Sequence, residues 1–206
     1  SSISKAQYGE FANKGNLGAA DYKLAVHLNS GRGVYTFCMC PGGVVVAAAS
    51  EENRVVTNGM SYYKRDKENA NSALVVTVSS KDFKSDKPLA GMEFQRHYEN
   101  LAYKIGGGNF KTPIQLLGDF LNDRKTTKLG KVNPSVLAND YTLASIGEAL
   151  PSYVVDSLKE GIESFDKKIN GFADYDAILT GIETRTSAPV RIERNNNLES
   201  ISLTGL

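Results

Sequence analysis

The spacing of apolar residues changes twice along this chain, and the double change constrains its fold more than any other feature. Over residues 21–85 apolar and polar side chains alternate, which is the period of a β-strand with one buried face. Over residues 86–175 the apolar side chains follow the 3.6-residue period of a helix, and alternation returns over residues 176–206. This order of strands, helices and strands predicts an α+β fold with helices inserted into an antiparallel β part.

The β part is predicted from apolar runs that end in turn residues. Strands are expected at 21–28, 33–40 and 44–50, and the turn Pro41-Gly42-Gly43 would join the last two in an antiparallel meander. Asn58-Gly59 is typical of a two-residue hairpin turn. Further strands are expected in the runs 73–79, 177–187, 189–194 and 198–203.

The helical part carries start and stop signals. Asp86, followed by Pro88, is a candidate cap for a helix that Gly106-Gly107-Gly108 would end. Thr112 to Gln115 has the capping-box pattern with proline at the first helical position, which predicts a second, short helix. Pro151 opens a longer helix whose apolar face would carry Val154, Val155, Leu158, Ile162 and Phe165.

These patterns divide the chain into predicted parts. Residues 1–20 are rich in Gly, Ala and Asn without a period and are expected to be a linker or junction. Residues 21–85 and 176–206 would form one antiparallel β subdomain, a sheet or a small barrel, and residues 86–175 the inserted helical subdomain.

Composition limits the classes of partner. The chain has 24 Lys and Arg against 23 Asp and Glu, a net charge of +1, which argues against nucleic acid as the main partner. Lys125, Lys128 and Lys131 keep a nucleic-acid-binding function as a weaker hypothesis. No apolar run approaches the ~20 residues of a membrane-spanning helix, and the N-terminus lacks the apolar core of a secretory signal. Both ends look cut, so we expect a piece of a longer, cytoplasmic protein.

The residues that most often carry chemistry are few. Cys38 and Cys40 have C-x-C spacing, and in a regular strand a disulfide between them would be strained, so buried thiols are expected. His27 and His97 have no partners at metal-ligand spacing and are expected on the surface. The paired acids Glu51-Glu52 are most simply solvated. No complete catalytic constellation is present, so the chemistry of a parent enzyme would come from a cofactor held elsewhere.

The run GIETRTSAPVRI, residues 181–192, is unusually polar for a strand. Glu183, Thr184, Arg185, Thr186 and Ser187 place hydrogen-bonding side chains at five successive positions. Such a group is expected where a strand faces a ligand or another domain. The alternative is that Glu183 and Arg185, which share one face of a strand, pair with neighbouring side chains.

Several unusual motifs carry a resemblance to a known family. FCMCPGG, TNGMSYY, ENANSAL and ETRTSAPVRI, together with most of the remaining chain, resemble the uncharacterised bacterial FAD-dependent dehydrogenases. In that family the Rossmann-type FAD-binding domain is split, with a phosphate-binding fingerprint before a segment like this one and a glycine-rich flavin motif after it. This chain lacks both motifs and therefore resembles the inserted substrate or cap domain alone. More distant flavoproteins build that insert from a β-barrel and a helical subdomain.

The resemblance implies flavin redox chemistry in the parent protein, with FAD as cofactor and NAD(P)H as a candidate electron donor. The implied partners are the FAD-binding domain of the same polypeptide and a small-molecule substrate, with neither nucleic acid nor membrane. The isolated chain is expected to be inactive and free of flavin. Residues expected to face the flavin or the substrate are Glu183, Arg185, Thr186, Ser187, Cys38, Cys40, Gly42, Gly43, Asn58, Ser61 and Arg65.

Two alternatives remain open at the level of sequence. Gly42 and Gly43 also suit a tight hairpin turn with no ligand. The whole chain could be a self-contained module that binds a ligand or a protein and has no enzymatic parent.

Overall fold

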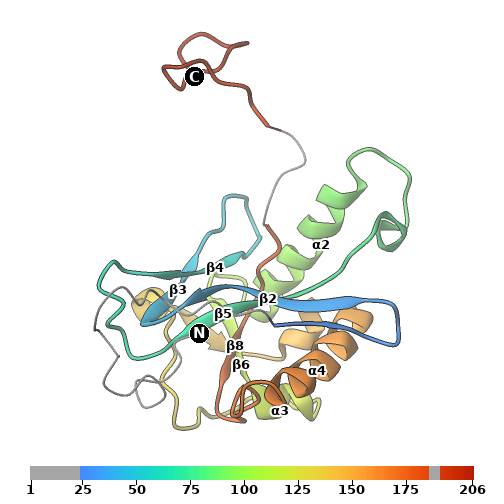
Figure 1. The fold of residues 1–206 in the computed structure, drawn as a ribbon, viewed down its shortest axis with the longest axis vertical. Coiled ribbons are helices and arrows are strands. Elements are labelled where there is room, and N and C mark those ends of the chain that lie inside the picture. The colour runs from blue at the N-terminus through green and yellow to red at the C-terminus, as the bar shows by residue number, and fades with distance from the viewer. Residues whose placement is uncertain (1–23, 186–190) are drawn as a thin grey trace.

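The computed structural model describes residues 24–185 and 191–206, which form three small sheets and three α-helices (Figure 1). The first sheet is antiparallel, in the order β1 (Ala25–His27), β2 (Gly33–Cys40) and β5 (Asn71–Val76). The second pairs β3 (Gly43–Ala47) with β4 (Thr57–Ser61), also antiparallel. These strands lie in the part of the chain where the alternating pattern predicted them.

The third sheet lies among the helices in sequence. Its central strand β6 (Thr112–Leu116) pairs in parallel with β7 (Tyr141–Leu143) and antiparallel with β8 (Ile178–Thr180). The α-helices are α2 (Ala90–Ile105), α3 (Leu117–Leu121) and α4 (Ser152–Asp166). Short 3-10 turns are η2 (Ser80–Phe83), η3 (Leu137–Asn139) and η4 (Ile146–Ala149).

The predicted α+β class is confirmed, and none of the three sheets closes into a barrel among the described residues. The predicted division into two subdomains remains a prediction. The strands β6 and β7 lie inside the range assigned to the helical part, and β8 pairs with β6 rather than with the strands before residue 85.

Helix α4 covers one face of the first sheet and forms the main core with it. Its apolar residues Leu158, Ile162 and Phe165 are buried together with Val34 of β2, as the helical period predicted. The helix approaches β2 closely because Gly161 has no side chain: a Cβ there would lie 2.6 Å from Cγ1 of Val34. Burial of each large apolar side chain contributes about 1.5–3 kcal/mol.

The glycine triplet ends α2 as predicted. The N–H groups of Gly106 and Gly107 donate to the carbonyls of Ala102 and Lys104, and Gly108 donates to Tyr103. Gly107 and Gly108 have positive φ values of 98° and 69°, which a helix C-terminus commonly requires and glycine adopts without steric cost. These glycines therefore terminate a helix and do not form a phosphate loop.

Two predicted elements are wrong. Asn58-Gly59 lies inside β4 and not in a hairpin turn; Gly59 is needed there because a Cβ would lie 2.1 Å from Oδ1 of Asn71. Thr112 to Gln115 begins no helix but forms β6, whose first four residues are all buried between β7 and β8. Burial on both faces removes the alternation by which a strand is recognised in sequence.

The predicted meander and the last strands also differ from the structure. β2 pairs with β1 and β5, whereas β3 turns away to pair with β4. The described part of the run 177–187, which ends at residue 185, contains only the short β8. Residues 191–206 contain a single bridge, between Arg194 and Ser200, and the first two residues of the predicted strand 189–194 lie outside the described residues. This last segment lies apart from the other described residues in Figure 1, so no neighbouring strand extends its pairing.

Candidate functional site

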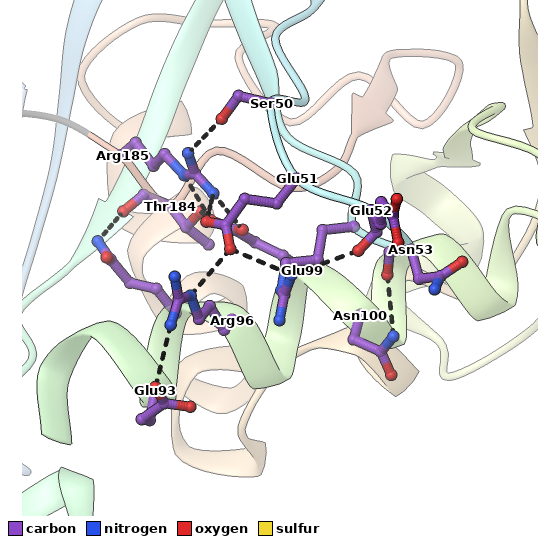
Figure 2. A network of polar contacts seen from close by, with 12 residues as sticks. Ser50, Glu51, Glu52, Asn53, Glu93, Arg96, Glu99, Asn100, Thr184 and Arg185 are labelled. Carbon is purple, nitrogen blue, oxygen red and sulfur yellow. Dashed lines mark hydrogen bonds and ion pairs between the residues drawn. The ribbon is translucent and has the colours of Figure 1, made fainter. Parts of the chain in front are cut away.

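The carboxylate of Glu99, on α2, is fully buried and lies at the centre of a polar network (Figure 2). Thr184 donates its hydroxyl to Oε1 of Glu99 over 2.7 Å. Arg185 donates from Nε to Oε1 over 2.9 Å and from Nη2 to Oε2 over 2.7 Å. This is the bidentate geometry in which a guanidinium and a carboxylate bind most strongly.

The remaining donors of Arg185 also bind protein groups. Nη1 donates to the hydroxyl of Ser50 over 2.8 Å, and Nη2 lies 3.0 Å from Oε1 of Glu51. The other carboxylate oxygen of Glu51 lies 2.9 Å from Nε of Arg96 and 3.1 Å from Nη1 of Arg54. Each nitrogen of the Arg185 guanidinium thus has a protein partner, so the side chain fastens the chain to α2. Its pairing with neighbours is the alternative that the sequence left open.

Charge and burial act in opposite directions on Glu99. Burial by itself raises the pKa of its carboxyl, but hydrogen bonds from Arg185 and Thr184 outweigh burial and hold the pKa below its ordinary value. The hydrogen bond to Glu99 in turn raises the pKa of Arg185. Both groups are therefore charged at neutral pH, and each stabilises the charged form of the other.

Backbone contacts hold the same segment, residues 182–185, which we call the junction segment. The carbonyl of Ile182 accepts from the N–H of Thr57 over 2.9 Å at the start of β4. The carbonyl of Thr184 accepts from Nε2 of Gln95 over 2.7 Å on α2. The junction segment is thus bound on one side to β4 and on the other to α2 before the chain continues.

Glu183 lies between these anchored residues and is half-buried. Burial raises the pKa of its carboxyl. Its carboxylate makes no hydrogen bond or ion pair with another residue in the ranges 24–185 and 191–206. The Glu183 carboxylate is therefore the acidic group of the junction segment that can bind a substrate or another part of the protein.

The thiol of Cys40 is partly buried at the end of β2, and burial raises its pKa. Its sulfur donates a hydrogen bond to the carbonyl of Cys38 over 3.1 Å. Ser61 of β4 binds the backbone of the next residue, Pro41, so two of the predicted site residues lie where the ends of β2 and β4 meet.

The run FCMCPGG forms a tight turn, the alternative that needs no ligand. A Cβ on Gly42 would lie 2.1 Å from the carbonyl oxygen of Arg65, and one on Gly43 would lie 2.5 Å from that of Met60. The hydroxyl of Ser61 donates to the carbonyl of Pro41 over 2.9 Å. Both glycines serve close contact between backbone segments, because the space that a side chain would need at each position is occupied by protein.

The prediction of buried thiols is wrong for Cys38, which is exposed, while Cys40 is partly buried. The reason is a β-bulge in β2 between Phe37 and Cys40, which interrupts the alternation of the strand. Asn58 and Arg65 are exposed, and Arg65 has a positive φ of 51°. His27 and His97 are exposed as predicted. Thr186 and Ser187 lie outside the described residues.

Sequence reasoning missed Glu99 and misread Glu51. Glu51 binds three arginines and is not simply solvated. The available signal for Glu99 was its position three residues before Ala102 on the buried face of α2. A carboxylate at such a position requires a cation from elsewhere in the chain, and Arg185 is that cation.

The described helix starts do not fit the phosphates of a dinucleotide. The first N–H groups of α3 donate to protein carbonyls, Leu117 to Ala177 over 2.8 Å and Gly118 to Tyr175 over 3.1 Å. α2 and α4 begin after Leu89 and Pro151 without a glycine-rich turn. A phosphate cradle needs such a turn and free N–H groups at a helix N-terminus, so none forms in the described ranges.

No cluster of three or more His, Cys, Asp or Glu side chains could hold a metal ion in the described part of the chain. None of the helices between residues 24 and 185 or after 191 combines the length and the apolar character needed to cross a bilayer.

Comparison with known proteins gives two findings. The sequence model of a family described as FAD-dependent protein, C-terminal domain-like, matches residues 1–186. An uncharacterized protein of Clostridium beijerinckii is 64% identical over 205 residues, which cover 99% of this chain and 38% of that protein. The chain therefore spans well under half the length of this curated relative.

Proposed function

We propose a function from one premise: the chain belongs to the FAD-dependent protein, C-terminal domain-like family. In our proposal it is the substrate-binding or cap domain of an FAD-dependent oxidoreductase, a dehydrogenase. The FAD-binding domain would be another part of the same polypeptide, which agrees with the greater length of the relative. FAD bound there would supply hydride or electron transfer, while this chain would bind and orient a small-molecule substrate and exclude water.

One combination of observations carries this proposal. The family is flavin-dependent, yet the helix starts of the described residues offer no place for the FAD phosphates. A domain of a flavoprotein whose described residues form no phosphate cradle is best explained as the part that covers the cofactor.

The contacts of the site residues suggest two roles, positioning of the junction segment and contact with the substrate. Arg185 and Glu99 would position the junction segment, because their polar atoms already bind each other and their neighbours. Glu183 and Cys40, with Ser61, would contact the substrate. Burial raises the pKa of the Glu183 carboxyl, and its oxygens would form hydrogen bonds with polar groups of the substrate.

The last segment would meet the FAD-binding domain. Ile192, Leu198, Ile201, Leu203 and Leu206 are each 57–76% exposed, although Asn195 orders the turn between them. Exposed apolar residues on an ordered turn suit a surface that another domain covers. NAD(P)H as electron donor, a cytoplasmic location, and the absence of nucleic-acid and membrane partners are further predictions of this function.

The test compares this chain with the full-length Clostridium beijerinckii relative. We expect the relative to purify with bound FAD, and its visible flavin absorbance to be lost when NADH or NADPH is added without oxygen. We expect this chain alone to leave FAD fluorescence unchanged in a titration. Tight stoichiometric FAD binding by this chain would overturn the cap assignment, and a relative that neither binds nor reduces FAD would overturn the oxidoreductase.

A further inference from the structure

Three guanidinium groups from separate segments of the chain converge on the carboxylate of Glu51. Its Oε2 lies 2.9 Å from Nε of Arg96 on α2 and 3.1 Å from Nη1 of Arg54, which precedes β4. Its Oε1 lies 3.0 Å from Nη2 of Arg185 in the junction segment. Figure 2 shows Arg185 and Arg96 approaching Glu51 from different sides. A single carboxylate thus occupies the position between three cations.

Two of these cations have more hydrogen-bonding capacity than Glu51 supplies. Nε of Arg54 and Nε of Arg96 are buried, and neither donates a hydrogen bond within the described residues, although Nε of Arg96 lies close to Glu51. A buried N–H group without an acceptor is unfavourable. The Glu51 carboxylate is tethered to its own backbone, whereas the carboxylate of a free molecule can turn until its oxygens meet both groups. Arg54 and Arg96 therefore offer donors that a bound anion would satisfy.

The Glu51 side chain can leave this position without a change in the fold. It lies on a turn in which residues 50, 52 and 53 are exposed, and 28% of its own side chain is exposed. The turn is fastened through its backbone, because the carbonyl of Asn53 accepts from Nδ2 of Asn100 on α2 over 2.9 Å. Arg185 would keep its two hydrogen bonds to Glu99, so the junction segment would stay in place.

The charges around the vacated position favour an anion. The arginines 54, 96 and 185 carry three positive charges. Apart from Glu51, the carboxylates within ion-pair distance of them in the described ranges are those of Glu99 and Glu93, and the Glu93 side chain is 66% exposed. Three positive and two negative charges leave a net charge of +1. Guanidinium groups also match the planar shape of a carboxylate.

We propose that Arg54 and Arg96 form a binding site for the carboxylate group of a small molecule, which takes the place of the Glu51 side chain. The ligand is a carboxylate because the group that holds the three arginines in the structure is itself a carboxylate. That this carboxylate belongs to the substrate of the flavin rests on the proposed cap function. The binding itself needs this chain alone.

Propionate is the probe, because it is the Glu51 side chain as a free molecule, and propionamide is its uncharged counterpart. The isotope-labelled chain is titrated with each at constant ionic strength, and the Nε–H signals of the arginines are followed by NMR. We expect propionate to shift the signals of Arg54 and Arg96 until they saturate, and propionamide to leave them unchanged. Glu51→Gln should bind propionate about tenfold or more tightly than the wild type, since the wild-type site is open for only a fraction of the time.

Glu52→Gln is the matched control, because it makes the same change of charge at the next residue. The Glu52 side chain is exposed, and the group that accepts from Nη1 of Arg54 is its backbone carbonyl, which the variant keeps. This variant should bind propionate as the wild type does. Wild-type arginine signals that do not respond to propionate would overturn the site, and so would equal affinities in Glu51→Gln and Glu52→Gln. Either result would leave the cap function standing, because neither measurement involves FAD.

Discussion

Helices α2 and α4 are nearly equal in length, at 16 and 15 residues, but of the two only α2 buries a charged side chain. α4 buries a stripe of apolar residues against the first sheet, whereas the buried residues of α2 are Ala90, Glu99 and Ala102. Apolar packing depends on contact area and shape and does not depend on charge. The contact of α2 with the junction segment depends on direction, because each hydrogen bond to Glu99 requires one orientation of Thr184 and Arg185.

The apolar core under α4 therefore contributes mainly stability, whereas the polar network on α2 positions the junction segment. The contribution of the core under α4 does not itself change with pH, because its buried side chains carry no charge. The polar network on α2 requires every partner to be present, since loss of one partner leaves a buried charge without compensation. It also fixes the junction segment that carries Glu183.

The largest loss of stability should come from a substitution in the apolar core under α4. Phe165→Ala removes a fully buried ring from the core of α4 and should lower the free energy of unfolding by about 4 kcal/mol. The loss should be the same at pH 8 and pH 5, because no charge changes. Urea unfolding followed by circular dichroism measures it, with exposed Glu163→Ala on the same helix as a control of about 0.5 kcal/mol or less. A strongly pH-dependent loss would contradict the apolar assignment.

A smaller loss of stability, which depends on pH, should come from a substitution in the polar network around Glu99. Arg185→Ala leaves the buried Glu99 carboxylate with Thr184 as its hydrogen-bond donor and should cost about 3 kcal/mol at pH 7. The folded-state pKa of Glu99 is lowered, so the pair contributes stability above the unfolded pKa and loses it as the pH falls. The difference between variant and wild type should therefore shrink below about pH 5.

A double-mutant cycle gives the control for this pair. Glu99→Gln removes the charge but keeps the shape, so the double variant with Arg185→Ala should be more stable than Arg185→Ala alone. Strictly additive losses in the two single variants would show that the pair is not coupled, and would remove Glu99 as the residue that positions the junction segment.

The smallest loss of stability should come from an ion pair at the edge of the apolar core under α4. Arg32 stacks over the ring of Tyr153 on α4 and binds Asp82 with Nη2 2.7 Å from Oδ1. The hydrogen bond from Arg32 lowers the pKa of Asp82 from 3.8 to about 2. Asp82→Asn should cost about 1–2 kcal/mol at pH 7. Because the folded pKa is depressed, this contribution is present above about pH 4 and is lost as the pH falls toward 2.

Thermal unfolding of wild type and Asp82→Asn across that pH range checks the sign. The two proteins should converge in stability near pH 2. A gap that stays constant with pH would mean that Asp82 acts through packing alone.

Sequence patterns predicted most of the fold where one face of an element is buried and the other is wet. The apolar stripe of α4, the glycine end of α2 and the exposed histidines follow from residue spacing and turn chemistry. β6 was misread because burial on both faces removes its alternation, and Gly59 was taken for a turn residue although it makes room for Asn71 inside β4. Glu183, Cys40 and Ser61 were expected in the site from their motifs and from the family resemblance, and their role there remains a prediction.

The sequence by itself determined the class of the fold, the position of its main core helix and the family, because these depend on local period and on motifs that stand together in the chain. Only the tertiary structure decided the role of Arg185 and the position of the thiols. Arg185 binds Glu99, 86 residues earlier in the chain, and this pairing depends on how α2 packs against the junction segment. The extra residue in β2 is visible only against the register of β5, and it leaves Cys38 exposed and Cys40 partly buried. Long-range pairing and register are properties of two segments together, so no single stretch of sequence contains them.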